Sequence, residues 1–288
     1  MKSGLVVLVG RSNVGKSTLM NTLVGTKIAA TSFRAQLTRH IIHGVMNNPE
    51  GQAVFVDTPG IFKDKRSELT AKLTRKAQAA VVDIDVIVYV VDPTREIGTE
   101  ERAVFGMIRY INKPKIMVIN KSDLHYDDKK HYAEYEKWAD EFDEVFHLSA
   151  LKGSHITPLK NAVIDFLPEG EQLYPDDQLT NIDNYFWIAE LIREKIFSVL
   201  DKELPYSVSV EVDNVEDKPE RDGKPRTMVI KARILTDEER YKKMIIGKRG
   251  MKIKEIGLIS RKELEQSTGT KVYLELEVEV DKHWVERL

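Results

Sequence analysis

The stretch Gly10-Arg11-Ser12-Asn13-Val14-Gly15-Lys16-Ser17 decides the fold of the first half of this chain. It follows the apolar run Leu5–Val9 and opens a helix-compatible stretch, and it matches the pattern G-x-x-x-x-G-K-S/T of a phosphate-binding loop, or P-loop. Its glycines let backbone N–H groups approach phosphate oxygens, and the helix after it directs its positive end at the same anion. We predict that Gly10 to Thr18 bind nucleotide phosphates, with Lys16 on the outer phosphates and the Ser17 hydroxyl on Mg²⁺.

Short apolar segments alternate with helix-compatible stretches downstream of the P-loop. Strands buried on both faces read as such continuous apolar runs, so the pattern predicts an α/β P-loop NTPase fold, a mostly parallel sheet with helices on both faces. The segments Ile41–Met46 and Gln52–Val56 flank a turn and predict a hairpin, hence one antiparallel edge strand. The apolar run of the second hairpin strand is Ala53–Val56, and the other expected strands are Leu5–Val9, Val86–Val91, Ile116–Ile119 and Val145–Leu148. The expected helices are Ser17–Val24, Ser67–Val82, Glu100–Tyr110, Lys129–Phe142 and Thr157–Phe166.

Composition excludes several classes of protein. The chain has 288 residues, a formal net charge of −2 and no cysteine, so disulfides, thiolate zinc sites and cysteine catalysis are impossible. No apolar run has the length of a signal peptide core or a membrane span. We expect a cytoplasmic monomer whose only membrane contact would be peripheral, on the inner face of the cell membrane.

The motif Asn120-Lys121-Ser122-Asp123 chooses the base. It directly follows the strand Ile116–Ile119. Guanine presents two adjacent donors that the Asp123 carboxylate can accept, whereas adenine would leave this carboxylate desolvated and unpaired. Asn120 would brace the loop and the Lys121 stem would cover the base. Ser149-Ala150-Leu151, after the next strand, would bring a backbone N–H to guanine O6.

Further residues are expected to sense the outer phosphate. Asp57-Thr58-Pro59-Gly60 ends a strand, so Asp57 would hold Mg²⁺ through water and the Gly60 N–H would contact the γ-phosphate. Thr38, in a polar stretch, could complete the Mg²⁺ shell only when the γ-phosphate is present, which makes a switch. Lys16, Thr38 and Gly60 are therefore the candidate catalytic residues.

The pattern changes after Leu167, which ends a first domain of residues 1–167. The polar stretch 168–183 reads as a linker, and residues 184–288 read as an α+β domain. In that domain Gly247-Lys248-Arg249-Gly250 lies between two helices and looks like the GXXG loop of a type II KH domain, which binds single-stranded nucleic acid. From Arg240 to Lys262 there are nine Lys or Arg and one acid, Glu255. We expect RNA at the loop and at Lys252, Ile253 and Lys254, with salt-dependent affinity.

Taken together, these motifs resemble the Era family within the TRAFAC class of translation-factor-like GTPases. The phrases GRSNVGKSTLMNTLVG, AQLTRH, FVDTPGIF, NKSD, SALKG, FLPEGEQLYPDD and IIGKRGMKIKEIG carry the resemblance, which covers about residues 4–280. It implies a Mg²⁺-dependent GTPase that cycles between GTP and GDP, binds small-subunit (16S) ribosomal RNA near its 3′ end and assists assembly of the 30S ribosomal subunit. The chain departs from the family pattern at Ser12, Leu37 and Glu277.

Hydrolysis is expected to be slow. Ile61 follows the DTPG turn where many GTPases carry Gln, and an aliphatic side chain cannot orient water. Asn13 matches a P-loop Asn that related GTPases use to hold K⁺ beside the phosphates, although a hydrogen bond within the loop would explain it equally well. An RNA-binding assembly chaperone that uses GTP only as a structural ligand remains the alternative. A tRNA-modification GTPase is disfavoured because its terminal cysteine motif is missing, and a tandem GTPase is excluded by the single P-loop.

Overall fold

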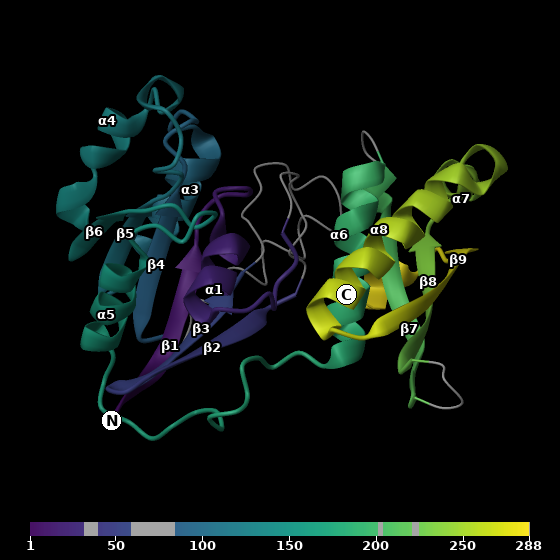
Figure 1. Ribbon diagram of the computed structural model, residues 1–288. Coiled ribbons are helices and arrows are strands. Elements are labelled where there is room, and N and C mark those ends of the chain that lie inside the picture. The colour runs from purple at the N-terminus through teal and green to yellow at the C-terminus, as the bar shows by residue number, and fades with distance from the viewer. Residues whose placement is uncertain (32–39, 59–83, 201–203, 221–224, 288) are drawn as a thin grey trace. The chain divides into compact units, whose positions relative to one another are not determined.

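The computed structural model describes residues 1–31, 40–58, 84–200, 204–220 and 225–287 (Figure 1). The chain divides into two compact units, Met1–Asn181 and Ile182–Leu288. Within the described residues, no helix combines the length and the apolar character that crossing a bilayer requires. The expected helix over 67–82 lies outside these residues.

The first unit is built on a six-stranded sheet with the order β2-β3-β1-β4-β5-β6. Neighbouring strands run parallel except β2 and β3, which form the expected antiparallel hairpin with β2 at the edge. Central strands such as β4 are buried along their whole length, which is why their sequences are continuously apolar. The strands are β1 (Lys2–Val9), β2 (Ile42–Asn48), β3 (Gly51–Asp57), β4 (Val86–Val91), β5 (Lys115–Ile119) and β6 (Glu144–His147).

Helices cover both faces of this sheet (Figure 1). The helices α1 (Lys16–Val24) and α5 (Ile156–Phe166) pack together and against β1 and β3. On the other face, side chains of α3 (Thr99–Ile108) and the short α4 (Tyr132–Glu136) pack on alternate residues of β1, β4 and β5. The expected fold class, a mostly parallel sheet between helical layers, is confirmed.

The expected helix over 129–142 is wrong as a single helix. The segment contains the five-residue α4 and the 3₁₀ turn η2 (Ala139–Glu141), and a second 3₁₀ turn, η1 (Tyr126–Asp128), precedes it. Its aromatic residues Tyr132 and Tyr135 lie on α4 and Trp138 lies just before η2, and all three pack on the core of the first unit. The Trp138 ring stacks on Phe105 of α3 at 4.5 Å between centroids, so tertiary packing overrides the helical propensity.

The polar stretch 168–183, expected to be a linker, is bonded to the first unit as far as Asn181. The fully buried Gln52 side chain accepts from the Tyr174 N–H at 2.9 Å and donates to the Tyr174 carbonyl at 2.8 Å. The Val45 N–H of the edge strand β2 donates to the carbonyl of Leu179 at 2.9 Å. An edge strand leaves backbone groups unpaired, and this segment satisfies them.

In the part that the structure describes, the second unit has a three-stranded sheet and three α-helices. β7 and β8 are antiparallel, and β8 and β9 are parallel, in the order β7-β8-β9. A single 3₁₀ turn, η4 (Lys248–Gly250), separates the last two helices, and η3 (Leu204–Ser207) and η5 (Trp284–Arg287) flank the sheet in sequence. The elements are α6 (Asn184–Val199), β7 (Val208–Lys218), β8 (Thr227–Thr236), α7 (Glu239–Ile246), α8 (Met251–Thr268) and β9 (Lys271–Val280).

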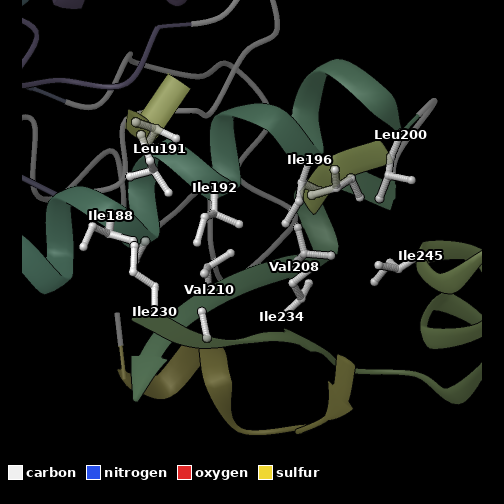
Figure 2. Packing of buried hydrophobic residues seen from close by; sticks show 14 of the residues in the cluster. Ile188, Leu191, Ile192, Ile196, Leu200, Val208, Val210, Ile230, Ile234 and Ile245 are labelled. Atoms are coloured by element: carbon white, nitrogen blue, oxygen red, sulfur yellow. The ribbon is translucent and has the colours of Figure 1, made fainter. Parts of the chain in front are cut away.

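One apolar core holds this unit together. Figure 2 shows side chains of α6 pointing toward those of β7 and β8. Ile192 of α6, Ile234 of β8 and Ile245 of α7 are all fully buried in this cluster, so the helices share one face of the sheet. The element order α-β-β-α-α-β is the type II KH arrangement expected from the sequence, and the KH assignment is confirmed.

Candidate functional site

The P-loop connects the end of β1 to the start of α1. The buried Lys16 ammonium donates to the carbonyls of Gly10 and Arg11, each at 3.0 Å, so it is held against the loop. Burial lowers the pKa of Lys16, and the negative charges of Asp57 and Glu101 oppose that shift. A phosphate at this ammonium would stabilise its charged form further.

The loop conformation depends on residues with positive φ. Gly10 has φ 156°, and a Cβ there would lie 2.4 Å from the carbonyl oxygen of Val90, so only glycine fits. Asn13 has φ 63°, a conformation that Asn adopts more readily than most residues. The expected phosphate-binding residues are therefore brought together in the wrapped loop that anion binding requires.

Two side-chain oxygens of the kind that bind Mg²⁺ lie side by side. The Ser17 hydroxyl donates to Oδ2 of Asp57 at 2.5 Å, and Asp57 is fully buried at the end of β3. The neighbouring Thr58 hydroxyl is turned away and donates to the carbonyl of Leu8. A hydroxyl and a carboxylate are hard oxygen donors, and Mg²⁺ takes few protein ligands because it keeps several waters. The residues present therefore fit Mg²⁺.

The two base-recognition motifs form one bonded unit. Oδ1 of Asp123 accepts from the Ser149 hydroxyl at 2.5 Å, while the rest of the Asp123 residue is exposed. Asn120 accepts from the Ala150 N–H at 2.9 Å and donates to the carbonyl of Val14 in the P-loop at 2.8 Å. The structure thus brings the expected guanine-binding residues together and ties them to the P-loop. Leu151 is exposed beside them.

Lys121 has φ 63° and its ammonium pairs with the buried carboxylate of Asp92 at 2.5 Å. The sequence reasoning missed Asp92, as it missed Arg95 and Glu101, which contact the P-loop. A signal existed: Asp92 directly follows a buried strand, as Asn120 does, and Asp57 is the last residue of another. Three predicted site residues, Thr38, Pro59 and Gly60, lie outside the described residues, as does Ile61.

The loop Gly247–Gly250 of the second unit, here called the GKRG loop, is shaped by positive φ angles at Gly247 (71°), Arg249 (53°) and Gly250 (74°). A Cβ on Gly247 would lie 2.9 Å from Cγ and 3.2 Å from the backbone nitrogen of Lys252. Lys248 and Arg249 are exposed at the tip of the loop. A tight, glycine-edged loop carrying two exposed cations suits close approach of a phosphodiester backbone.

Apolar and basic side chains continue on both sides of the GKRG loop. Lys254 is exposed, and Lys252 and Ile253 are partly exposed, on the first turn of α8. Met244 and Met251, which flank the loop, are 50% and 59% exposed. Apolar side chains beside a cationic loop can hold splayed bases while the cations hold phosphates.

Comparisons with known proteins give the family. Residues 5–121 match the family model described as 50S ribosome-binding GTPase, and residues 203–285 match the KH domain model. The chain is 41% identical to GTPase Era of Halothermothrix orenii over 99% of this chain and 95% of that protein. It is 39% identical to GTPase Era of Staphylococcus haemolyticus over 98% of this chain and 93% of that protein.

Solved structures agree. A crystal structure of Era in complex with MgGDPNP and nucleotides 1506–1542 of 16S ribosomal RNA has a TM-score of 0.89 and 38% identity, covering 100% of this chain and 96% of that one. An Aquifex aeolicus Era variant bound to GDP and aluminium fluoride matches with the same TM-score, identity and coverage. Relatives of this similarity over nearly full length, together with the P-loop, the guanine-specific motifs and the KH unit, show that the chain belongs to the Era family of GTPases.

Proposed function

We propose that this GTPase binds small-subunit ribosomal RNA near its 3′ end through the GKRG loop and the first turn of α8, and that its nucleotide state governs this binding during assembly of the 30S subunit. The observation that carries the proposal is the shape and charge of the GKRG loop. The exposed cations Lys248 and Arg249 lie on a loop whose backbone has positive φ at three of its four residues. The exposed Met244 and Met251 lie on either side of this loop. The Era relative whose crystal structure contains 16S ribosomal RNA supports the choice of ligand.

GTP hydrolysis needs positioning and charge stabilisation more than covalent chemistry. Lys16 would hold the outer phosphates by its ammonium, and the P-loop N–H groups would stabilise charge that develops on them. Asp123 and Asn120 would fix the guanine end, so the triphosphate lies in one register along the loop. Bound Mg²⁺ would neutralise phosphate charge, with Ser17 and Asp57 as its protein ligands.

A monovalent cation is a further part of this proposal. Asn13 has φ 63° and lies next to Ser12 in the middle of the P-loop, and these two residues are here called the crest of the loop. Its side-chain carbonyl is an oxygen ligand of the kind that K⁺ accepts. A cation there would supply the positive charge that other GTPases obtain from an arginine finger.

The proposal is tested by measuring RNA affinity in defined nucleotide states. An oligonucleotide with the 3′-terminal sequence of 16S ribosomal RNA is titrated against protein loaded with a non-hydrolysable GTP analogue or with GDP. We expect tighter binding in the GTP-analogue state and a steep loss of affinity with salt. Equal affinity in both states would contradict nucleotide control, and equal affinity for a scrambled oligonucleotide would contradict the choice of ligand.

A matched pair of variants locates the RNA site. In Lys248→Ala/Arg249→Ala, two phosphate contacts are lost, so the affinity falls by about tenfold or more and the salt slope becomes shallower by about two. The control Lys218→Ala/Arg226→Ala removes the same charge from exposed positions at the β7–β8 ends, where both cations pair with acids. An equal loss in the control would mean that general charge, and not the GKRG loop, binds the RNA.

A further inference from the structure

The chain between β4 and α3 begins with a buried carboxylate. Asp92 has no exposed surface, and its Oδ2 accepts from the Lys121 ammonium at 2.5 Å. Its Oδ1 accepts from both the backbone N–H and the hydroxyl of Thr94, at 3.0 and 2.8 Å. Asp92 therefore shapes its own turn and, with its other oxygen, holds the lysine of the guanine-specific motif.

The same turn carries an arginine to the P-loop. The backbone N–H of Arg95 donates to the carbonyl of Asp92 at 3.2 Å, and the Arg95 guanidinium donates to the carbonyl of Ser12 at 3.0 Å. In the opposite direction, the Arg11 guanidinium donates to the carbonyl of Glu96 at 3.0 Å. Two arginines thus join two adjacent residues of the P-loop to two adjacent residues of this turn.

A buried acid completes the attachment. Glu101, in the first turn of α3, has no exposed surface and pairs with Nε of Arg11 at 2.9 Å. The Tyr89 hydroxyl donates to its Oε1 at 2.5 Å, and the Tyr135 hydroxyl lies 3.0 Å from its Oε2. Burying an ion pair costs desolvation that its attraction barely offsets, so such a pair is weak evidence for stability. Its consequence is geometric, because it fixes the side chain of a P-loop residue.

We propose that the β4–α3 segment, Asp92–Glu101, is a positioning element of the nucleotide site, in which Asp92 positions the base-covering Lys121 and Arg95 positions the crest of the P-loop. These residues belong to none of the sequence motifs that define the site. Side chains that contact a ligand work only when a second layer of hydrogen bonds holds them. The segment supplies that layer to both ends of the nucleotide.

The two positioning residues predict separable kinetic defects. In Asp92→Asn the turn can keep its acceptor for Thr94, but the charge that holds Lys121 is lost. The charged hydrogen bond between residue 92 and the Lys121 ammonium is then weakened whichever nucleotide is bound. We therefore expect GDP and GTP to dissociate about tenfold faster, while the single-turnover hydrolysis rate at saturating GTP is unchanged. In Arg95→Gln the crest of the P-loop is held less firmly against the outer phosphates. The single-turnover hydrolysis rate should therefore fall by about tenfold or more.

The test measures nucleotide dissociation and single-turnover hydrolysis in the full chain for both variants. The controls are Asp127→Asn and Arg102→Gln, which remove the same charges from exposed positions of the same unit and are expected to behave as the wild type. Arg95→Lys, which can still donate to the Ser12 carbonyl, should recover most of the hydrolysis rate. Arg95 is on a partly exposed turn, so this half of the test stands even if Asp92→Asn fails to fold.

Two results would overturn the proposal. If the variants shift only the melting temperature and leave dissociation and hydrolysis at wild-type values, the segment has a structural role alone. If both variants slow hydrolysis and speed dissociation by the same factors, the assignment of Asp92 to the base and of Arg95 to the phosphates is wrong.

Discussion

A Cβ on Gly15 would lie 2.3 Å from Nδ2 of Asn120, so the P-loop and the guanine-specific motif touch at a glycine. The same Nδ2 donates to the carbonyl of Val14 at 2.8 Å. Phosphate recognition and base recognition are therefore one contiguous structure in this protein.

Gly15→Ala is expected to abolish nucleotide binding. The methyl group would displace Asn120, and φ 103° at this position is unfavourable for any residue with a Cβ. We expect nucleotide affinity to fall by at least about a hundredfold, measured by titration with a fluorescent GDP.

Gly106→Ala is the control, since nothing lies within 4 Å of its Cβ. That change, on an exposed helical residue, should stabilise α3 by about 0.5–1 kcal/mol. Unimpaired GDP binding by Gly15→Ala would contradict the contact.

Asp123→Asn is expected to change the preferred base from guanine to xanthine. The Asn carbonyl can accept from N1–H and its amide can donate to the C2 oxygen of xanthine, whereas the N2 amine of guanine would face a donor. The Ser149 hydroxyl can still donate to Oδ1, so the loop keeps its shape. Competition between xanthosine and guanosine diphosphates for the site measures the change, and a variant that still prefers guanine would refute the role of Asp123.

Gly247→Ala is expected to weaken RNA binding, with Gly269→Ala as the control at a glycine of the same unit. Both glycines have positive φ, but Gly247 (φ 71°, ψ 174°) lies in a region that is essentially restricted to glycine, whereas Gly269 (φ 63°, ψ 13°) is left-handed helical, so alanine is strained at both positions and more strongly at 247. Only the Cβ at 247 meets a neighbour, Lys252. We expect an RNA affinity about tenfold lower for Gly247→Ala and unchanged for Gly269→Ala. Equal RNA affinity in the two variants would contradict the proposed site.

His43 is expected to make stability depend on pH. Its Nδ1 lies 2.8 Å from the Tyr174 hydroxyl, and burial lowers the pKa of His43 below its usual 6.5. The unfolded chain then binds the proton more readily than the folded chain. The contribution of His43 to the free energy of unfolding is therefore fully present above pH 6.5 and is lost as pH falls from 6.5 through the lowered pKa. His43→Gln should therefore show a flatter dependence of unfolding free energy on pH below 6.5.

His283 serves as the internal control for this titration. Its hydrogen bond to Glu286 raises the pKa of this exposed imidazole. In an NMR titration His43 should change protonation below pH 6.5 and His283 above it. Titration of His43 at or above 6.5 would contradict its burial.

Potassium is expected to accelerate hydrolysis. Single-turnover rates in K⁺ should exceed those in Na⁺ by about tenfold, because a K⁺ held by Asn13 would add to the stabilisation of the transition-state charge, whereas a cation free in solution would not. Asn13→Gly keeps the positive φ accessible but removes the side-chain ligand, so it should lose the difference between the two cations. Identical rates in K⁺ and Na⁺ for the wild type would remove this role of Asn13.

The parts of the fold that follow from local pattern could be predicted from the sequence. Strands such as β4 are buried on both faces and are therefore apolar throughout. The P-loop motif predicts the strand before it and the helix after it. The broken helix over 129–142 could not, because it depends on where Trp138 meets Phe105. The docking of residues 168–181 could not either, since one buried side chain, Gln52, bonds a stretch whose composition is that of a linker.

The candidate site shows the same division. Residues that are expected to contact the nucleotide carry motifs, so Asp123 and Ser149 could both be assigned to the guanine in advance, and the structure adds the hydrogen bond between them. Residues that hold those atoms in place, such as Asp92 and Arg95, carry no motif because their partners lie far away in sequence. Their role can be recognised only in the folded sheet, where β4 pairs with β1, which leads into the P-loop, and with β5, which leads into the guanine-specific motif.

Single-turnover GTP hydrolysis, measured with and without the 3′-terminal 16S RNA oligonucleotide, tests most directly whether one molecule couples its two units. We expect slow hydrolysis by the protein alone and a faster rate with the RNA, and we expect Lys248→Ala/Arg249→Ala to lose the acceleration. The same rate with and without bound RNA would contradict this expectation and would favour an RNA-binding protein that uses GTP only as a structural ligand.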